Sequence, residues 1–250
     1  GNIAFVGDVV VDGDVLDGFN VRSGGSLTVG GNVGACRLDS EGDLIIRGGV
    51  FGKGRARLRA KGRLAARFLN DCQAESSAEM VIEREAVGST LMTNSQLTML
   101  AGRLVGGKVS ALRGIDVGVL GSPLGVPTSV AAGTDYNLAR RQSEVEARIG
   151  EVDASVEKIS EFLSPLLGDR HRMASLIERR RGDMSRLLAA LRDLRAERRS
   201  LAADLEELAE ASHRGAVRQI NFGREMHPGV LLEIGPVRHR VKQKTSGPLS

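Results

Sequence analysis

Six cations alternate with glycine, alanine or leucine between residues 53 and 63, in the run KGRARLRAKGR. On a β-strand this alternation places the cations on one face and Ala56 and Leu58 on the other. Such a row could bind nucleic acid, an anionic membrane or an acidic protein. We therefore take Lys53, Arg55 and Arg57 as candidate interaction residues.

A structural role competes with this interpretation of the basic run. If residues about 18 apart in the chain lie side by side on neighbouring strands, Arg59 lies beside Asp39 on the preceding strand and beside Glu75 on the following one. Arg63 is likewise level with Asp43 and Glu79. Opposite charges on adjacent strands stabilise a sheet modestly, so we favour a charge ladder for these positions. Arg57 falls between Arg37 and Gln73 and has no carboxylate beside it.

Other patterns that could carry chemistry are weak. The run from Gly102 to Lys108 resembles a phosphate-binding loop, but Val109 stands where a serine or threonine belongs. The four histidines have no metal-ligand spacing, and no serine or cysteine has the surroundings of a nucleophile. We expect no catalytic residue, metal or cofactor, and hence no enzyme. Cys36 and Cys72 are interpreted as unbridged, buried small residues.

Composition limits the classes of partner. The chain has 250 residues, 41% hydrophobic and 26% charged, with a formal net charge of +4. Aromatic residues make up only 3%, which disfavours the stacking grooves that hold sugars or single-stranded nucleic acid. No apolar run is long enough to span a membrane, and no signal peptide is visible. The first residue is glycine and opens directly into a repeat, so we expect an amino-terminal portion to be missing.

The elements that would position the cations follow from a repeat of about 18 residues. Pairs of apolar or small residues two apart recur at this interval, which predicts short strands stacked in a parallel β-solenoid of about seven coils. Glycines at the corners, such as Gly24-Gly25 and Gly48-Gly49, fit tight turns. The first residues of the pairs are Val9, Leu27, Leu44, Leu64, Met80, Leu97 and Ile115, and a second column holds Val21, Leu38, Leu58, Ala74, Leu91 and Val109.

Residues 136–213 contain only three glycines and repeat leucine-type residues every three and four positions. This period is typical of a coiled-coil seam, and a break near residues 164–169 predicts an antiparallel hairpin. Placing Leu166 opposite Met173 brings Gln142 level with Arg198. We expect these two exceptions to the apolar seam to form one polar layer that sets the register.

Strand patterns return at Val217, Ile220 and Phe222, and again from Val230 to Ile234. We expect these strands to pack back on the solenoid. The predicted organisation is a β-helix over residues 1–134, a coiled-coil hairpin over 135–214, carboxy-terminal strands over 215–243 and a disordered tail over 244–250.

Four segments together resemble the FapA (flagellar assembly protein A) family. They are GDVVVDGDVLDGF from Gly7, GGVFGKG from Gly48, GSPLGVPTSVAAG from Gly121 and MHPGVLLEIG from Met226. The resemblance implies a right-handed parallel β-helix similar to the carboxy-terminal domain of the cell-division inhibitor MinC. It implies a cytoplasmic bacterial protein tied to polar or flagellar organisation, with a separate amino-terminal domain and no catalytic residues. Two features depart from the family pattern: the helices are rich in arginine, and Ser76-Ser77-Ala78 replaces a glycine corner.

These observations leave three functions to compare. The first is a non-enzymatic scaffold that docks proteins, and itself as a homo-oligomer, through the solenoid or the hairpin. The second is a module that binds nucleic acid or an anionic membrane through the basic run. The third, an enzyme acting on polysaccharide, lacks the aromatic groove expected of it. We favour the scaffold, in the cytoplasm, at the cell pole or the inner face of the membrane.

Overall fold

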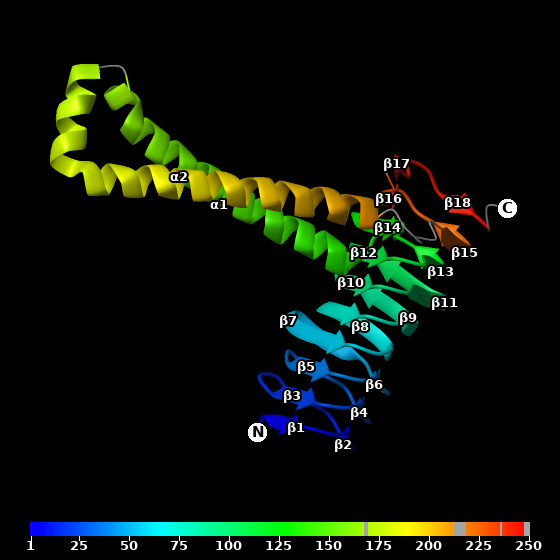
Figure 1. The fold of residues 1–250 in the computed structure, drawn as a ribbon. Helices are drawn as coiled ribbons and strands as arrows, with labels where there is room; N and C mark the ends of the chain where they lie inside the picture. The colour runs from blue at the N-terminus through cyan, green and yellow to red at the C-terminus, as the bar shows by residue number, and fades with distance from the viewer. Residues whose placement is uncertain (168–169, 213–218, 236, 248–250) are drawn as a thin grey trace. The chain divides into compact units, whose positions relative to one another are not determined.

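The computed structural model describes residues 1–167, 170–212, 219–235 and 237–247. Of residues 163–167, 170–184 and 212 it describes only the backbone. The chain divides into two compact units, Gly1–Tyr136 with Gly215–Ser250, and Asn137–Arg214. The first unit is a parallel β-solenoid and the second is a helical hairpin (Figure 1). Each unit is described by itself below.

The solenoid has three sides. Strands of successive coils stack in register along two of them, sides A and B (Figure 1), and side C is formed by isolated bridges and by parts of bent strands. Side A opens each coil and side B follows it. The side A strands are β1 (Ile3–Phe5), β3 (Asn20–Ser23), β5 (Arg37–Ser40), β7 (Val50–Ala60), the end of β8 (Leu64–Ser76), β10 (Thr90–Thr93), β12 (Gly107–Ala111), β14 (Thr128–Ala132) and β16 (Val230–Ile234). The side B strands are β2 (Val9–Val11), β4 (Leu27–Val29), β6 (Leu44–Ile46), β8 (Leu64–Ser76), β9 (Met80–Val87), β11 (Gln96–Val105), β13 (Gly114–Leu120) and β15 (Ile220–Met226).

Both predicted apolar columns are confirmed. On side B, Val9 pairs with Leu27, Leu27 with Leu44 and Leu44 with Leu64, and the column continues through Met80 and Leu97 to Ile115. On side A, Val21 pairs with Leu38 and the ladder continues to Val109. These side chains are buried and fill the core. Seven coils therefore precede the helices, as the repeat predicts.

A third buried column, on side C, was not predicted. It contributes a single inward residue per coil, and its members are Val15, Val33, Val50, Leu69, Ala86, Leu104, Leu120 and Met226. One inward residue gives no period-two pair, so the alternation that revealed the other sides is missing here. Bent strands such as β8, which supplies Leu64 to side B and Ala74 to side A, carry the ladder around the corners.

Polar groups at the corners bind the coils to one another. The carboxylate of Asp8 accepts a hydrogen bond from the backbone N–H of Ser26 at 2.6 Å, one coil later. Buried hydroxyls do the same on the inside: Ser40 Oγ lies 2.8 Å from the carbonyl of Gly25 and 2.9 Å from that of Asp43. Ser76, in the corner without glycine, makes the equivalent contacts to Gly62 and Ala78. The hydroxyls of Ser40 and Ser76 are thereby satisfied by backbone carbonyls.

The glycines that resemble a phosphate loop are a solenoid corner. Gly106 and Gly107 have φ values of 69° and 77°, which only glycine adopts easily. Gly106 lies between β11 and β12, and Gly107 begins β12, so the strand-to-helix context of a phosphate loop is absent at this point.

The carboxy-terminal strands continue the solenoid rather than covering its side. β15 pairs in parallel with β13, and β16 pairs in parallel with β14, so they add an eighth coil and begin another. Two antiparallel strands then end the ladders: β17 (Val237–Arg240) on β16, and β18 (Thr245–Ser246) on β15. The tail that we expected to be disordered from residue 244 is therefore ordered at Thr245 and Ser246. Backbone hydrogen bonds and an ion pair from Lys244 to Glu225 at 2.8 Å hold it.

The helical hairpin replaces one corner of the eighth coil. It consists of α1 (Tyr136–Leu167) and α2 (Arg170–Ser212), and it lies in the chain between β14 and β15. In the seventh coil the same corner is only Leu112 and Arg113. α1 continues to Leu167, and the rest of the predicted break near residues 164–169 lies outside the described residues.

Candidate interaction surfaces

The cations of the run from Lys53 to Arg63, which we call the basic stripe, point outward from the solenoid. Ala56, Leu58 and Ala60, between them, are buried in the core. The predicted alternation is thus present, and β7 is the element that positions Arg55, Arg57 and Arg59.

Both ends of the basic stripe are neutralised by acids. Lys53 Nζ lies 2.6 Å from Asp17 Oδ2, and this hydrogen bond lowers the pKa of Asp17. Lys61 forms an ion pair with Glu41, which lowers the pKa of Glu41. Arg63 Nε lies 3.7 Å from Glu79 Oε2, as the charge ladder predicts. The sequence did not predict the Lys53–Asp17 pair. These residues are 36 apart, which is two coils, whereas the charge ladder compared only residues on adjacent coils.

The middle of the basic stripe keeps an excess of positive charge. Arg59 lies in register between Asp39 and Glu75, but Asp39 forms its ion pair with Arg37 at 2.7 Å. Arg57 is paired in the ladder with Arg37 and Gln73. Over the described part of the chain, no carboxylate lies within ion-pair distance of Arg55 or Arg57.

The predicted layer of Gln142 and Arg198 does not form. Arg198 Nε instead donates to Asp153 Oδ1 at 2.6 Å, and Asp153 lies 11 residues beyond Gln142, about 16 Å along the helix. The guanidinium of Arg148 binds Glu197 in the same way, at 2.7 Å. The two charge-assisted hydrogen bonds, Arg198 to Asp153 and Arg148 to Glu197, stabilise the hairpin more than one contact with the neutral amide of Gln142 would. They therefore favour a register that is shifted from the predicted one.

The direction of the apolar seam agrees with the heptad pattern where side chains are described. Val152 and Leu191 are buried, and the other apolar seam positions of both helices are half-buried. The seam residues from Leu163 to Met184, with Arg180 among them, have side chains outside the described set.

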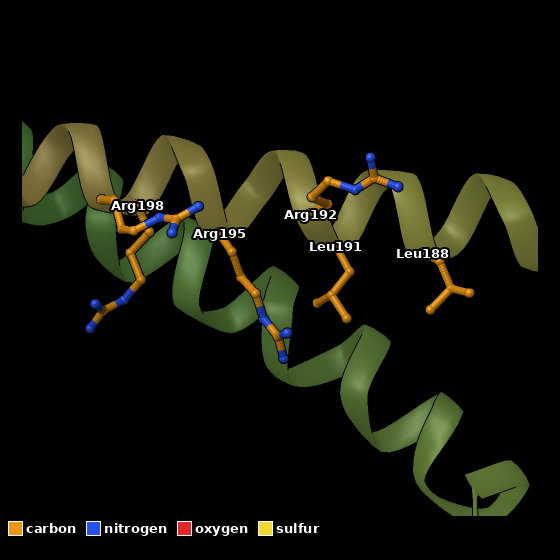
Figure 2. A pocket seen from close by; sticks show the side chains of 6 residues that line it. Leu188, Leu191, Arg192, Arg195 and Arg198 are labelled. Carbon is orange, nitrogen blue, oxygen red and sulfur yellow. The ribbon is translucent and has the colours of Figure 1, made fainter.

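One face of α2 lines a groove of about 450 Å³, which we call the arginine groove. Figure 2 shows Leu188, Leu191 and Arg195 directed toward the space beside α1, where the two helices separate. The lining residues recur every three or four positions and so share one helix face. They are Leu188, Leu191, Arg192, Arg195, Arg198 and Arg199. Sequence reasoning missed this face because it singled out only Arg198 from it.

A second groove, of about 700 Å³, lies on side C of the first three coils. Leu16, Phe19 and Phe51 form its apolar walls, and the Lys53–Asp17 pair lies at its rim. Phe51 packs edge-to-face on Phe68, with ring centroids 4.9 Å apart. The low aromatic content gave no hint that these phenylalanines gather on one side.

Chemically reactive groups are sparse in the described residues. Within the described residues, no group of three or more histidine, cysteine, aspartate or glutamate side chains could hold a metal ion. Cys36 and Cys72 are unbridged and buried, and burial raises the pKa of both thiols to about 11. His227 Nε2 lies 3.2 Å from Glu225 Oε2 near the end of the solenoid. Neither described helix is long and apolar enough to cross a membrane.

A three-sided parallel solenoid that carries a helical hairpin in one corner defines a β-solenoid protein with a helical insertion. The chain belongs to the FapA family: the model of the Flagellar Assembly Protein A beta solenoid domain matches residues 1–249, essentially the whole chain. Searches of curated proteins and of solved structures returned no match.

Proposed function

We propose that this chain is a non-enzymatic scaffold of the bacterial cytoplasm, which organises flagellar or polar assemblies through protein–protein contacts. Membership of the FapA family supports the link to flagellar assembly. The repeated sides of a solenoid support a binding role, because such architectures offer long regular surfaces to partners. The hairpin is the part that we assign to partner docking.

The observation that carries this proposal is the way in which the hairpin is inserted. Val130 on β14 pairs with Leu232, and Ile115 on β13 pairs with Ile220, so the solenoid keeps its register on both sides of the insertion. The solenoid therefore does not need the helices to continue its ladder. An insertion of this length that the core does not require is best explained by a function of its own.

Deletion of residues 134–217 tests the proposal. It leaves three residues between Ala132 and Ile220, the same number as between their ladder partners Ala111 and Ile115 in the seventh coil. In the bacterium that encodes the protein, we expect loss of the gene to reduce swimming in soft agar and the number of flagella. The full-length gene should restore both, and the deletion variant should not, although it accumulates to the same level. Full restoration by the deletion variant, or normal flagella without the gene, would contradict the proposal.

Self-association is a further part of the scaffold hypothesis. Size-exclusion chromatography with light scattering measures it directly, for the full chain and for the deletion variant. A mass of one chain at every concentration would remove homo-oligomerisation from the proposal and leave docking of other proteins in place.

The second candidate function is binding of an anionic polymer or membrane surface, and the unpaired guanidiniums of Arg55 and Arg57 favour it. Binding of this kind weakens steeply with salt. R55E/R57E should abolish binding to duplex DNA or to phosphatidylglycerol vesicles at low salt. K53E should have a smaller effect, since Asp17 already neutralises Lys53. No binding by the unaltered protein at low salt would eliminate this function.

A further inference from the structure

We propose that the arginine groove binds an acidic amphipathic helix of a partner protein. This inference rests on the proposed scaffold function and identifies the chemistry of one partner. The groove belongs entirely to described residues of α2 and contains both parts of a helix-binding surface, an apolar end and a cationic end.

The apolar end is formed by Leu188 and Leu191. Leu191 is only 8% exposed, whereas Leu188, one turn earlier on the same face, is 50% exposed. Figure 2 shows both side chains directed into the space beside the diverging ribbon of α1. Leu188 lies beside the seam rather than in it, so it extends the apolar surface of α2 beyond the buried Leu191 and stays half-exposed. Apolar side chains from another helix would complete the burial.

The cationic end is formed by Arg192, Arg195 and Arg199. Two acids of the hairpin bind other arginines: Asp153 binds Arg198 at 2.6 Å, and Glu197 binds Arg148 at 2.7 Å. Among the described side chains, none forms an ion pair with these three arginines. The groove therefore carries an excess positive charge that a carboxylate-rich partner would neutralise. Guanidinium groups bind carboxylates with two parallel hydrogen bonds, which also fixes orientation.

The combination favours a protein helix over nucleic acid. A phosphate backbone would satisfy the arginines but would leave Leu188 and Leu191 facing charge. The lining has no aromatic side chain on which a base could stack. An amphipathic helix matches both ends, since leucines three and four residues apart would enter the apolar end while glutamates beside them reach the arginines.

Fluorescence anisotropy of labelled peptides with the full-length protein tests the inference. The probe is a helical peptide of about 20 residues, with leucines every three and four positions and glutamates elsewhere. Three comparison probes are the same peptide with lysine for glutamate, polyglutamate, and a short DNA duplex. We expect binding of the leucine–glutamate peptide alone, weakening as salt rises.

Two variants locate the binding site. R192E/R195E/R199E should weaken binding at least about tenfold, because attraction becomes repulsion at three contacts. L188A, at a half-exposed position, should weaken it by a smaller factor. The matched control is R47E/R67E/R84E, which makes the same change in net charge at exposed positions of the solenoid and should bind normally. Circular dichroism should show unchanged helix content in every variant.

Three results would overturn the inference: no binding of the leucine–glutamate peptide, equal weakening by the control triple, or tighter binding of the duplex. Each can occur while deletion of residues 134–217 still abolishes flagellation. Failure of this inference is thus distinguishable from failure of the scaffold proposal.

Discussion

Ile115 and Ile220 are adjacent partners in one parallel ladder, although the whole helical hairpin lies between them in the chain. The partner ladder on side A shows the same continuity, from Val130 to Leu232. The eighth coil is therefore closed by pairing between residues far apart in the chain.

The first prediction is that the solenoid folds without the hairpin. Deletion of residues 134–217 removes Tyr136, which is buried and whose backbone N–H donates to Asn94 Oδ1 at 3.1 Å. We expect a cost of about 2 kcal/mol from this loss, and a fall in melting temperature of roughly 5 °C. Circular dichroism and scanning calorimetry measure these changes. An aggregated or non-cooperative product would show that the helices are needed to close the coil.

The second prediction concerns a corner where Asp71 faces Gly88 in the next coil. Both residues have left-handed backbones, with φ values of 47° and 59°, and a Cβ on Gly88 would collide with Asp71 Oδ1. G88A should destabilise the protein by about 1–3 kcal/mol. D71G should be neutral or stabilising, because it relieves the left-handed strain of a non-glycine residue.

The double variant D71G/G88A separates the collision from the backbone strain. It should be more stable than the sum of the single changes, since the atom that collides has been removed. Urea unfolding of the four proteins gives the coupling energy. Strict additivity would mean that backbone strain alone accounts for the effect of G88A.

The third prediction is that both cysteines are unreactive in the folded protein. With a pKa of about 11 instead of 9.0, each thiol carries about one hundredth of the usual thiolate at pH 8. Labelling with a thiol reagent should be slow in buffer and complete for two thiols in denaturant. If one thiol is labelled early, comparison of the single variants C36S and C72S shows which cysteine has reacted.

The raised thiol pKa also sets the sign of a pH effect on stability. The unfolded chain loses these protons near pH 9 and the folded chain near pH 11. Deprotonation therefore favours unfolding, and the stability that is present below pH 9 falls between about pH 9 and 11. C36S/C72S should reduce this loss, and an unchanged pH profile in this variant would contradict the assignment.

The fourth prediction tests the register of the hairpin. D153R or R198D places like charges opposite each other, whereas D153R/R198D restores an ion pair of reversed polarity. Because the pair is exposed, we expect a coupling energy of only about 0.5–1 kcal/mol in thermal unfolding followed by helix signal. Q142A should show no coupling with R198D. Coupling of Arg198 to Gln142 instead of Asp153 would contradict the observed register and support the one that the heptad pattern predicts.

Much of the solenoid was predictable because its stacking is encoded at short range. The pairs at Leu27, Leu44 and Leu64 alternate with outward residues, and a constant interval leaves only one way to stack them. Side C repeats at a similar interval but shows one inward residue per coil, so no alternation marks it. The outward direction of Arg55 and Arg57 was likewise predictable, whereas the pairing of Lys53 with Asp17 spans two coils and was not.

The amino-acid order alone determined the FapA-type solenoid, the presence of two helices and the outward cations, since each depends on residues at most one coil apart. Tertiary structure decided that the final strands continue the ladder across the hairpin, that Arg198 binds Asp153, and that leucines and arginines of α2 share a groove. These relationships depend on which distant surfaces pack best, and the free energy of that choice is shared among many contacts.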